Sequence, residues 1–449
     1  MEKLRSFAAT KLHKYTTAKG KRCLLVQGGQ FGLPGALAID HFLPINLKRR
    51  SVQSRSVNAN STIRRRSLGL NRNLKLLLVV GVASALANGI LAPVIAPYFL
   101  QLGLSGSEVG SLNSVMGVAA AVSLVPAAYL ADLKGRKMLA LLAFVASLPA
   151  VLLAVLGSKP LLYIAFALIG FANAAAGVAI NPLLADSVKE KDQMDSVFSV
   201  FQIVNLASSS LGMLLSWPLL AFSGVLGGVL AVYKTALLIS AALFAVCLPV
   251  LTAVHEPRRS NGKFELKVSK IALKLAGLHA LLAFGAGMGV WIIGYWFARK
   301  YGVGAGELGL RGVAENLLIV AATASTPFLS SKLGTLTAVV ALQLASAPLM
   351  VATALSPSFL IAATLFTLRS ALANASNPLV SSLQMRLVRD EERARMSMLN
   401  VLAWQVAGAA GSALGGILLD AWVDLPLYAA AAVYLVQALL FYLALRGVE

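Results

Sequence analysis

The stretch Ala131-Asp132-Leu133-Lys134-Gly135-Arg136-Lys137 is a compact charged turn between two long apolar runs, 109–131 and 138–156. A helix that crosses a lipid bilayer needs about 20 apolar residues, and a charged turn between two such helices must lie in water. Lys and Arg collect in the turns on the cytoplasmic side of a membrane. The stretch therefore predicts a helical hairpin that crosses a membrane and turns on the cytoplasmic side.

The composition extends this prediction to most of the chain. Hydrophobic residues make up 58% of the sequence and charged residues only 13%, and the mean hydropathy is +0.78. These values are too apolar for an ordinary soluble protein, so we expect an all-α polytopic membrane protein. Twelve apolar runs are long enough to span a bilayer: 74–100, 107–131, 138–156, 160–186, 194–222, 230–254, 271–298, 308–328, 335–355, 357–385, 393–420 and 426–445.

The basic residues indicate how these spans are oriented. Of the 39 Lys and Arg residues, fifteen lie in residues 1–73 and eighteen in the other segments that a twelve-helix chain with a cytoplasmic N-terminus places inside. Five lie on the other side, and one, Arg369, lies within an apolar run. The excess predicts that both termini are cytoplasmic, in a cell membrane.

Residues 1–73 form a basic tail with only two acidic residues, Glu2 and Asp40, and without a sustained amphipathic period. We expect a disordered, solvated tail or an upstream extension, attracted at most weakly to anionic lipid headgroups. An organelle transit peptide is the alternative, since the tail is rich in Arg and Ser and poor in acid, and it would place the protein in an organelle membrane. Nucleic-acid binding is not expected, because membrane lipids already satisfy these charges.

An internal repeat divides the remaining chain. Asn181-Pro182-Leu183 in the fourth run matches Asn377-Pro378-Leu379 in the tenth, 196 residues later, and a charged turn follows each copy. The polar segment 255–270 lies between the two copies. We therefore expect an N-terminal bundle over 74–254, a cytoplasmic linker over 255–270 and a C-terminal bundle over 271–446.

The opening turn resembles a signature of the major facilitator superfamily, Gly-x-x-x-Asp-Arg-x-Gly-Arg-Arg/Lys between the second and third helices. Asp132, Gly135, Arg136 and Lys137 match it, whereas Leu133 replaces a basic residue and Ala128 replaces the first glycine. A degenerate second copy, residues 331–335, keeps the glycine at Gly334 but has Ser331 in place of the acid and Thr335 in place of the Arg.

This resemblance implies twelve transmembrane helices in two pseudo-symmetric six-helix bundles, which rock around a site at the membrane midplane. It also implies that Asp132, Gly135, Arg136 and Lys137 form a conformational latch that helps to close the cytoplasmic side. The first and seventh helices of the superfamily line its central cavity, so Asn88 and Trp291 are expected there. Tyr295, Trp296 and Tyr301 are expected in an aromatic belt at the outer membrane interface.

Enzyme chemistry is not indicated. There is no Gly-rich phosphate loop of the Walker kind, and no Ser, His and acid set can be placed in one water-accessible pocket. The two cysteines, Cys23 and Cys247, lie in the tail and in an apolar run, so neither a disulfide framework nor a metal cluster is expected. We therefore expect no cofactor and no metal.

Ionisable residues inside the membrane are the candidates for transport chemistry, because each costs roughly 3 kcal/mol at the bilayer centre. Arg369 lies about 18 Å along the tenth run, at 1.5 Å per residue. Its guanidinium must face the bundle interior and bind a carboxylate, a phosphate-like group, helix carbonyls or an anionic substrate. The alternative is a structural Arg that ties helix ends together.

Glu315 is the candidate proton-binding group, with Arg311 four residues before it on the same helix face. The alternative is a salt bridge between the two at the outer mouth. If Glu315 instead reaches Arg369, that pair is the strongest candidate for ion coupling. Small polar residues, among them Asn374 and Asn377, could bind a polar substrate or one another. His279 is expected to be a hydrogen-bonded core residue rather than a proton relay.

These observations predict a secondary active transporter that moves a small solute by alternating access, with proton coupling through Glu315 as an option. The fifth-helix pattern of drug-proton antiporters and the sugar-porter signature are both absent, so no substrate is assigned, and export is slightly favoured over uptake. Arg369 mildly favours an anionic substrate. The alternative function is a non-transporting membrane sensor or scaffold that uses the basic tail as its output.

Overall fold

The computed structural model describes residues 13–16, 22–25, 71–188, 193–256, 269–389 and 392–447. The chain forms two units, Met1–Arg65 and Arg66–Glu449. In the first unit, β1 (His13–Thr16) and β2 (Arg22–Leu25) pair as antiparallel strands, with His13 opposite Leu25. Apart from these strands, the predictions of a disordered tail and of a transit peptide concern residues outside the described part.

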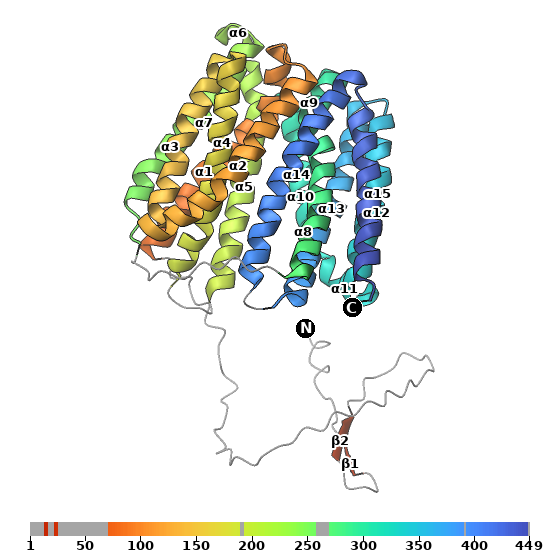
Figure 1. The fold of residues 1–449 in the computed structure, drawn as a ribbon. Coiled ribbons are helices and arrows are strands. Elements are labelled where there is room, and N and C mark those ends of the chain that lie inside the picture. Colours follow the sequence, from red (N-terminus) through yellow and green to blue (C-terminus); the bar gives the residue numbers. More distant parts are fainter. Residues whose placement is uncertain are drawn as a thin grey trace, which may run out of the picture. The chain divides into compact units, whose positions relative to one another are not determined.

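The second unit is helical (Figure 1). We refer to α1 to α7 as the N-terminal half and to α8 to α15 as the C-terminal half. The first half consists of α1 (Arg72–Gln101), α2 (Gly106–Lys134), α3 (Arg136–Leu156), α4 (Lys159–Asp186), α5 (Met194–Ala221), α6 (Ser223–Leu226) and α7 (Val229–Thr252). The second consists of α8 (Lys270–Gly289), α9 (Ile293–Tyr301), α10 (Ala305–Ala324), α11 (Thr326–Leu333), α12 (Thr335–Leu355), α13 (Phe359–Leu387), α14 (Arg393–Ala421) and α15 (Leu425–Leu445).

Within the described residues, eleven helices are long and apolar enough to cross a membrane, and α8 with α9 counts as one of them. A twelfth span results if α10 and α11, which meet at a bend of 41°, are taken together. The bend follows from Pro327 in the first turn of α11, since proline lacks the N–H that would continue the helix. The eighth span therefore runs on to Leu333, beyond the end of the predicted run, and is not straight.

Large apolar side chains cover the outside of this unit. Val122, Ile203 and Leu360 are each at least 66% exposed. A soluble protein would bury many such side chains, whereas lipid tails solvate them. This distribution agrees with a polytopic membrane protein.

The internal repeat is visible in the backbone of two turns. Gly135 between α2 and α3 has φ +94° and ψ 155°, and Gly334 between α11 and α12 has φ +81° and ψ 157°. Side chains rarely adopt this backbone conformation, so both turns need glycine. The predicted alignment of Gly334 with Gly135 is thus matched in geometry, although the charges around them differ.

We call the end of the unit that holds these two turns the basic end, and the end that holds the α3–α4 and α9–α10 connections the opposite end. The two halves meet where α2 packs along α14 and α5 packs along α10. Ser216 Oγ donates to Ala305 O across the second contact at 3.0 Å, close to the opposite end. These contacts join the halves at the opposite end and around the middle of the helices.

Candidate functional site

A central cavity of about 550 Å³ lies between the halves. Its walls come from helices of both halves and include three residues that the sequence singled out, Asn88, Trp291 and Arg311. Leu91, Ile95, Phe99 and other apolar side chains form much of the remaining lining. The structure thus brings Asn88 and Trp291 to one cavity, while their part in substrate binding stays a prediction.

Arg311 and Glu315 form an ion pair of 2.9 Å between Nη1 and Oε2, one turn apart on α10. The guanidinium of Arg311 also lies 5.3 Å from the ring centroids of both Phe297 and Phe366. Among the residues that the structure describes, no ion pair joins Glu315 to Arg369. The local pairing, which was the alternative in the sequence, is therefore the arrangement in this conformation, and the aromatic contacts show that Arg311 is buried rather than at an exposed mouth.

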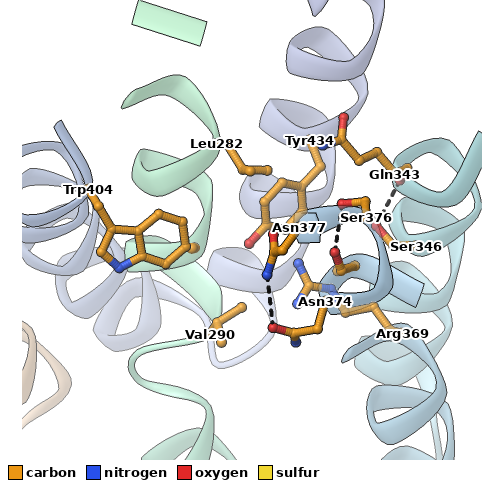
Figure 2. Close-up of a pocket in the computed structure, with 12 residues that line it drawn as sticks. Leu282, Val290, Gln343, Ser346, Arg369, Asn374, Ser376, Asn377, Trp404 and Tyr434 are labelled. Atoms are coloured by element: carbon orange, nitrogen blue, oxygen red, sulfur yellow. Dashed lines mark hydrogen bonds between the residues drawn. The ribbon is translucent and has the colours of Figure 1, made fainter. Parts of the chain in front are cut away.

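A second, smaller pocket of about 130 Å³ lies within the C-terminal half, and Arg369, Asn374 and Asn377 of α13 all line it (Figure 2). Asn377 Nδ2 donates to Asn374 Oδ1 at 3.3 Å, so the two predicted amides bind each other. The Arg369 guanidinium lies 4.6 Å from the ring centroid of Tyr434 on α15. The tenth-span candidates are therefore gathered around one space.

Arg369 is only 4% exposed. No Asp or Glu is among the described residues that line its pocket, and its Nε has no hydrogen-bond partner in the described part of the chain. A buried charge normally has a partner of opposite charge, because desolvation of an unpaired ion is expensive. The aromatic rings of Tyr434 and Phe366 compensate only part of this cost. The pocket is therefore chemically suited to an anion.

His279, on α8, lines another hollow, with Asn400 and Trp404 of α14. Its ring lies 5.4 Å from that of Trp404, and Trp404 also lines the Arg369 pocket. His279 is thus stacked on an aromatic ring. The predicted hydrogen-bonded core role is not what the ring contact shows.

The predicted latch residues lie at the α2–α3 turn, and their partners are not the ones expected. Arg136 Nη1 pairs with Asp186 Oδ2 at 2.5 Å, at the end of α4. Asp132 is exposed and forms no ion pair with any residue that the structure describes. In this conformation the acid that binds Arg136 is therefore Asp186, and the role of Asp132 in closing the cytoplasmic side stays a prediction.

The start of α3 is held by a residue of the predicted linker. The Arg136 and Lys137 backbone N–H groups donate to Glu256 at 2.8 and 2.9 Å, and a Cβ on Gly135 would lie 2.7 Å from Glu256 Oε2. Gly135 has no side chain to cap the helix, so the Glu256 carboxylate satisfies the free N–H groups and the positive helix end. The glycine is thus required for both the turn and this close approach.

At the opposite end, Asp420 of α14 closes the contact between the halves. Its Oδ1 and Oδ2 accept hydrogen bonds from the backbone N–H groups of Gly106 and Ser107, at 2.8 and 2.7 Å. Arg299 pairs with the same carboxylate at 2.6 Å. A carboxylate of the C-terminal half therefore caps the first turn of α2, a helix of the N-terminal half.

Close packing extends this contact along the helices. A Cβ added to Gly110 of α2 would lie 2.4 Å from Ser412 O, and one added to Gly416 of α14 would lie 2.3 Å from Gly106 O. Only glycine fits at these positions, because any side chain would force the helix backbones apart. The approach of α2 to α14 is therefore encoded by small residues on both helices.

The profile of the Major Facilitator Superfamily matches residues 77–297, which include the charged turn and the first break of the C-terminal half. The chain belongs to the major facilitator superfamily. Its fold, two pseudo-symmetric bundles of six spans, is that of superfamily transporters and not of an enzyme. No curated protein matches the sequence.

Solved structures of superfamily members share this fold. A mutant of the nucleoside transporter NupG is 14% identical, with a TM-score of 0.66 over 84% of this chain and 99% of its own. A bacterial homologue of the human lysosomal transporter Spinster, inward-facing and occupied, is 15% identical, with a TM-score of 0.68 over 83% and 96%. A POT family transporter in complex with 5-aminolevulinic acid is 15% identical, with a TM-score of 0.65 over 84% and 97%.

Sequence reasoning missed several residues of this superfamily member that hold its parts together. Asp186, Glu256 and Asp420 each bind a group that is 50 or more residues away along the chain. Their only signal in the sequence is an acid at the end of an apolar run or at the start of the linker. Such a position is typical of any interfacial residue, so spacing alone could not name the partners.

The expected aromatic belt is wrong for two residues. Trp296 is fully buried, and its indole N–H donates to Asp424 at 3.2 Å. Tyr295 is 3% exposed and its hydroxyl donates to Leu104 O of the N-terminal half. Their positions near a span end suggested the interface, but α9 turns them into the contact between the halves.

Proposed function

We propose that this protein is a secondary active transporter that moves a small organic anion by alternating access. The observation that carries the proposal is Arg369, a buried cation on a pocket inside the C-terminal half whose described lining holds no countercharge. An anionic solute would supply the missing negative charge, and a guanidinium binds a carboxylate through two parallel hydrogen bonds. The solved relatives, which include a nucleoside transporter and one in complex with 5-aminolevulinic acid, support a small molecule as the cargo.

The contact between the halves supports one state of the alternating-access cycle. Asp420, Gly110 and Ser216 join the halves at or near the opposite end. The excess of Lys and Arg argues that the basic end is cytoplasmic, so the structure is closed toward the outside. An inward-facing relative with a TM-score of 0.68 agrees with this assignment. Rocking of the halves would then break the Asp420 contact and open the other side.

Proton coupling is proposed for Glu315. Its carboxylate pairs with Arg311, which lines the central cavity, so protonation of Glu315 would release a cation into that cavity. Substrate binding and proton binding would then compete for the same guanidinium. Export is proposed ahead of uptake, and the direction follows from the assay below.

The test uses purified protein in liposomes and a screen of radiolabelled monocarboxylates, with and without a pH gradient. We expect Arg369→Gln to lower anion flux at least tenfold, because the pocket loses the positive charge of Arg369, and Arg369→Lys to retain part of it. Arg446→Gln, which removes one charge from the exposed end of the chain, is the matched control. Undiminished anion flux in Arg369→Gln would overturn the assignment.

A further inference from the structure

The two cavities meet at the break in the seventh span. Val290 lines both of them, whereas Ala286, one turn earlier, lines only the small pocket and Trp291 only the central cavity. The N–H groups of Val290 and Trp291 both donate to Ala286 O, at 2.7 and 3.0 Å, and the helix resumes only at Ile293. Irregular backbone inside a membrane is tolerated where it lines a cavity. The break therefore forms a shared wall.

Phe366 is a second shared element. The guanidinium of Arg311, on the central cavity, lies 5.3 Å from its ring centroid, and that of Arg369, on the small pocket, lies 5.9 Å from it. The two cations differ in their surroundings. Arg311 is paired with Glu315, whereas no acid lines the Arg369 pocket among the described residues. A negative group that enters from the central cavity is thus attracted past Phe366 to Arg369.

The sizes and linings of the cavities differ in the same sense. The small pocket, of about 130 Å³, is below the usual range of roughly 300–1,000 Å³ for organic ligands, and the central cavity, of about 550 Å³, is within it. The polar side chains of Arg369, Asn374 and Asn377 line the small pocket (Figure 2). Apolar side chains such as Leu91, Ile95 and Phe99 line the large one. Neither cavity alone suits a solute with both a charge and an apolar body.

We propose that the two cavities form one bipartite site for an amphipathic organic anion. Its carboxylate binds Arg369 and the Asn374 and Asn377 amides, and its apolar body passes Val290 and lies in the central cavity. This inference rests on the proposed anion transport and adds the class of substrate. It makes Val290 a residue that sets the permitted length of the substrate.

The experiment measures binding to the full-length protein in lipid nanodiscs. The probes are phenylacetate, 3-phenylpropionate, 4-phenylbutyrate and 5-phenylpentanoate, each compared with the corresponding alcohol. We expect affinity to rise by up to about fourfold for each added methylene that is buried, and each acid to bind at least tenfold more tightly than its alcohol. Arg369→Gln should abolish the preference for acid over alcohol but keep the dependence on length.

Val290→Phe should remove the dependence on length, because the larger side chain blocks the passage, while phenylacetate still binds in an Arg369-dependent way. Val320→Phe, which adds the same bulk on a half-exposed position of α10, is the matched control. Val290→Ala guards against a folding defect in the larger variant, and it should bind the long acids at least as tightly as the unmodified protein.

The outcomes separate this inference from the function on which it rests. If Arg369→Gln binds every acid as the unmodified protein does, the anion site itself is wrong. If acids bind through Arg369 without a dependence on length, or with one that protein-free nanodiscs reproduce, the bipartite site is wrong and the anion site stands. The same holds if Val290→Phe and Val320→Phe show equal length dependence.

Discussion

At the scale of single residues, the charged turn shows how partners are chosen by position in space. Arg136 has an acid four residues before it, Asp132, yet it pairs with Asp186, which is 50 residues away. The Asp186 side chain is 5% exposed, so its charge is stabilised by this pair rather than by water. Asp132 lies in solvent in this conformation and is free to act only after the halves move.

We expect Asp186→Asn to lower the free energy of unfolding by about 1–3 kcal/mol, because Arg136 would then face a neutral partner in a largely buried site. Asp132→Asn should leave stability unchanged and reduce flux, if Asp132 binds the C-terminal half when the basic end closes. Thermal unfolding in detergent and flux in liposomes measure the two effects. Equal stability of the Asp186 variant and the unmodified protein would contradict the first expectation.

Glu315→Gln should uncouple transport from the proton gradient. The amide cannot bind a proton, so exchange of labelled for unlabelled anion should persist while accumulation driven by a pH gradient is lost. Glu307→Gln is the control on the same helix, since Glu307 is exposed and only caps the first turn of α10. Accumulation that survives in Glu315→Gln would remove this residue from the coupling mechanism.

At the scale of secondary structure elements, the contact between α2 and α14 sets the state of the molecule. The backbones approach closely at Gly110 and Gly416, and Asp420 caps the start of α2. Both features favour the joined opposite end, and neither is needed within one half. A transporter must be able to break such a contact, which explains why it consists of a few polar bonds and small residues rather than a large apolar interface.

Gly110→Ala should shift the population toward a state that is open at the opposite end, because its Cβ would lie 2.4 Å from Ser412 O. A cysteine at Asn113, which lines the central cavity, reports this shift when an impermeant maleimide is added on that side, with Cys23 and Cys247 replaced by Ser. Labelling should be several-fold faster than in the unmodified background. Asp420→Asn should act in the same direction.

Gly177→Ala is the matched control for this prediction, because no atom lies within 4 Å of a Cβ placed there on α4. Its labelling rate should equal that of the background. If Gly110→Ala labels no faster than Gly177→Ala, the α2–α14 contact does not control access from the opposite end.

At the scale of the whole molecule, the helical unit contains all the residues of both cavities, and the first 65 residues form a unit of their own. The basic tail is the output in the sensor or scaffold hypothesis and is dispensable in the transporter hypothesis. The two functions therefore differ in what they require of the chain.

Deletion of residues 1–67 should leave anion flux in liposomes within about twofold of that of the full chain, since the first helix begins at Arg72. Flux is compared at equal amounts of reconstituted protein. A complete loss of flux in the truncated protein, with the fold retained by thermal unfolding, would favour the hypothesis in which the tail is functional.

The sequence by itself predicted the membrane spans, the repeat and the residues that gather at the two cavities. Spans are readable because each must be about 20 apolar residues long wherever it packs, and the repeat survives as Asn-Pro-Leu and as the glycines of two turns. Arg369 stood out because a charge at that depth is costly whatever its neighbours are.

Only the tertiary structure decided which groups meet. It paired Glu315 with Arg311 instead of Arg369, Arg136 with Asp186 instead of Asp132, and buried Trp296 between helices. Partners in these contacts come from separate helices or depend on how a helix is rotated, and apolar patterning barely specifies rotation when lipid and protein interior are equally apolar. The wall at Val290 likewise exists only because two cavities, each built from several helices, meet there.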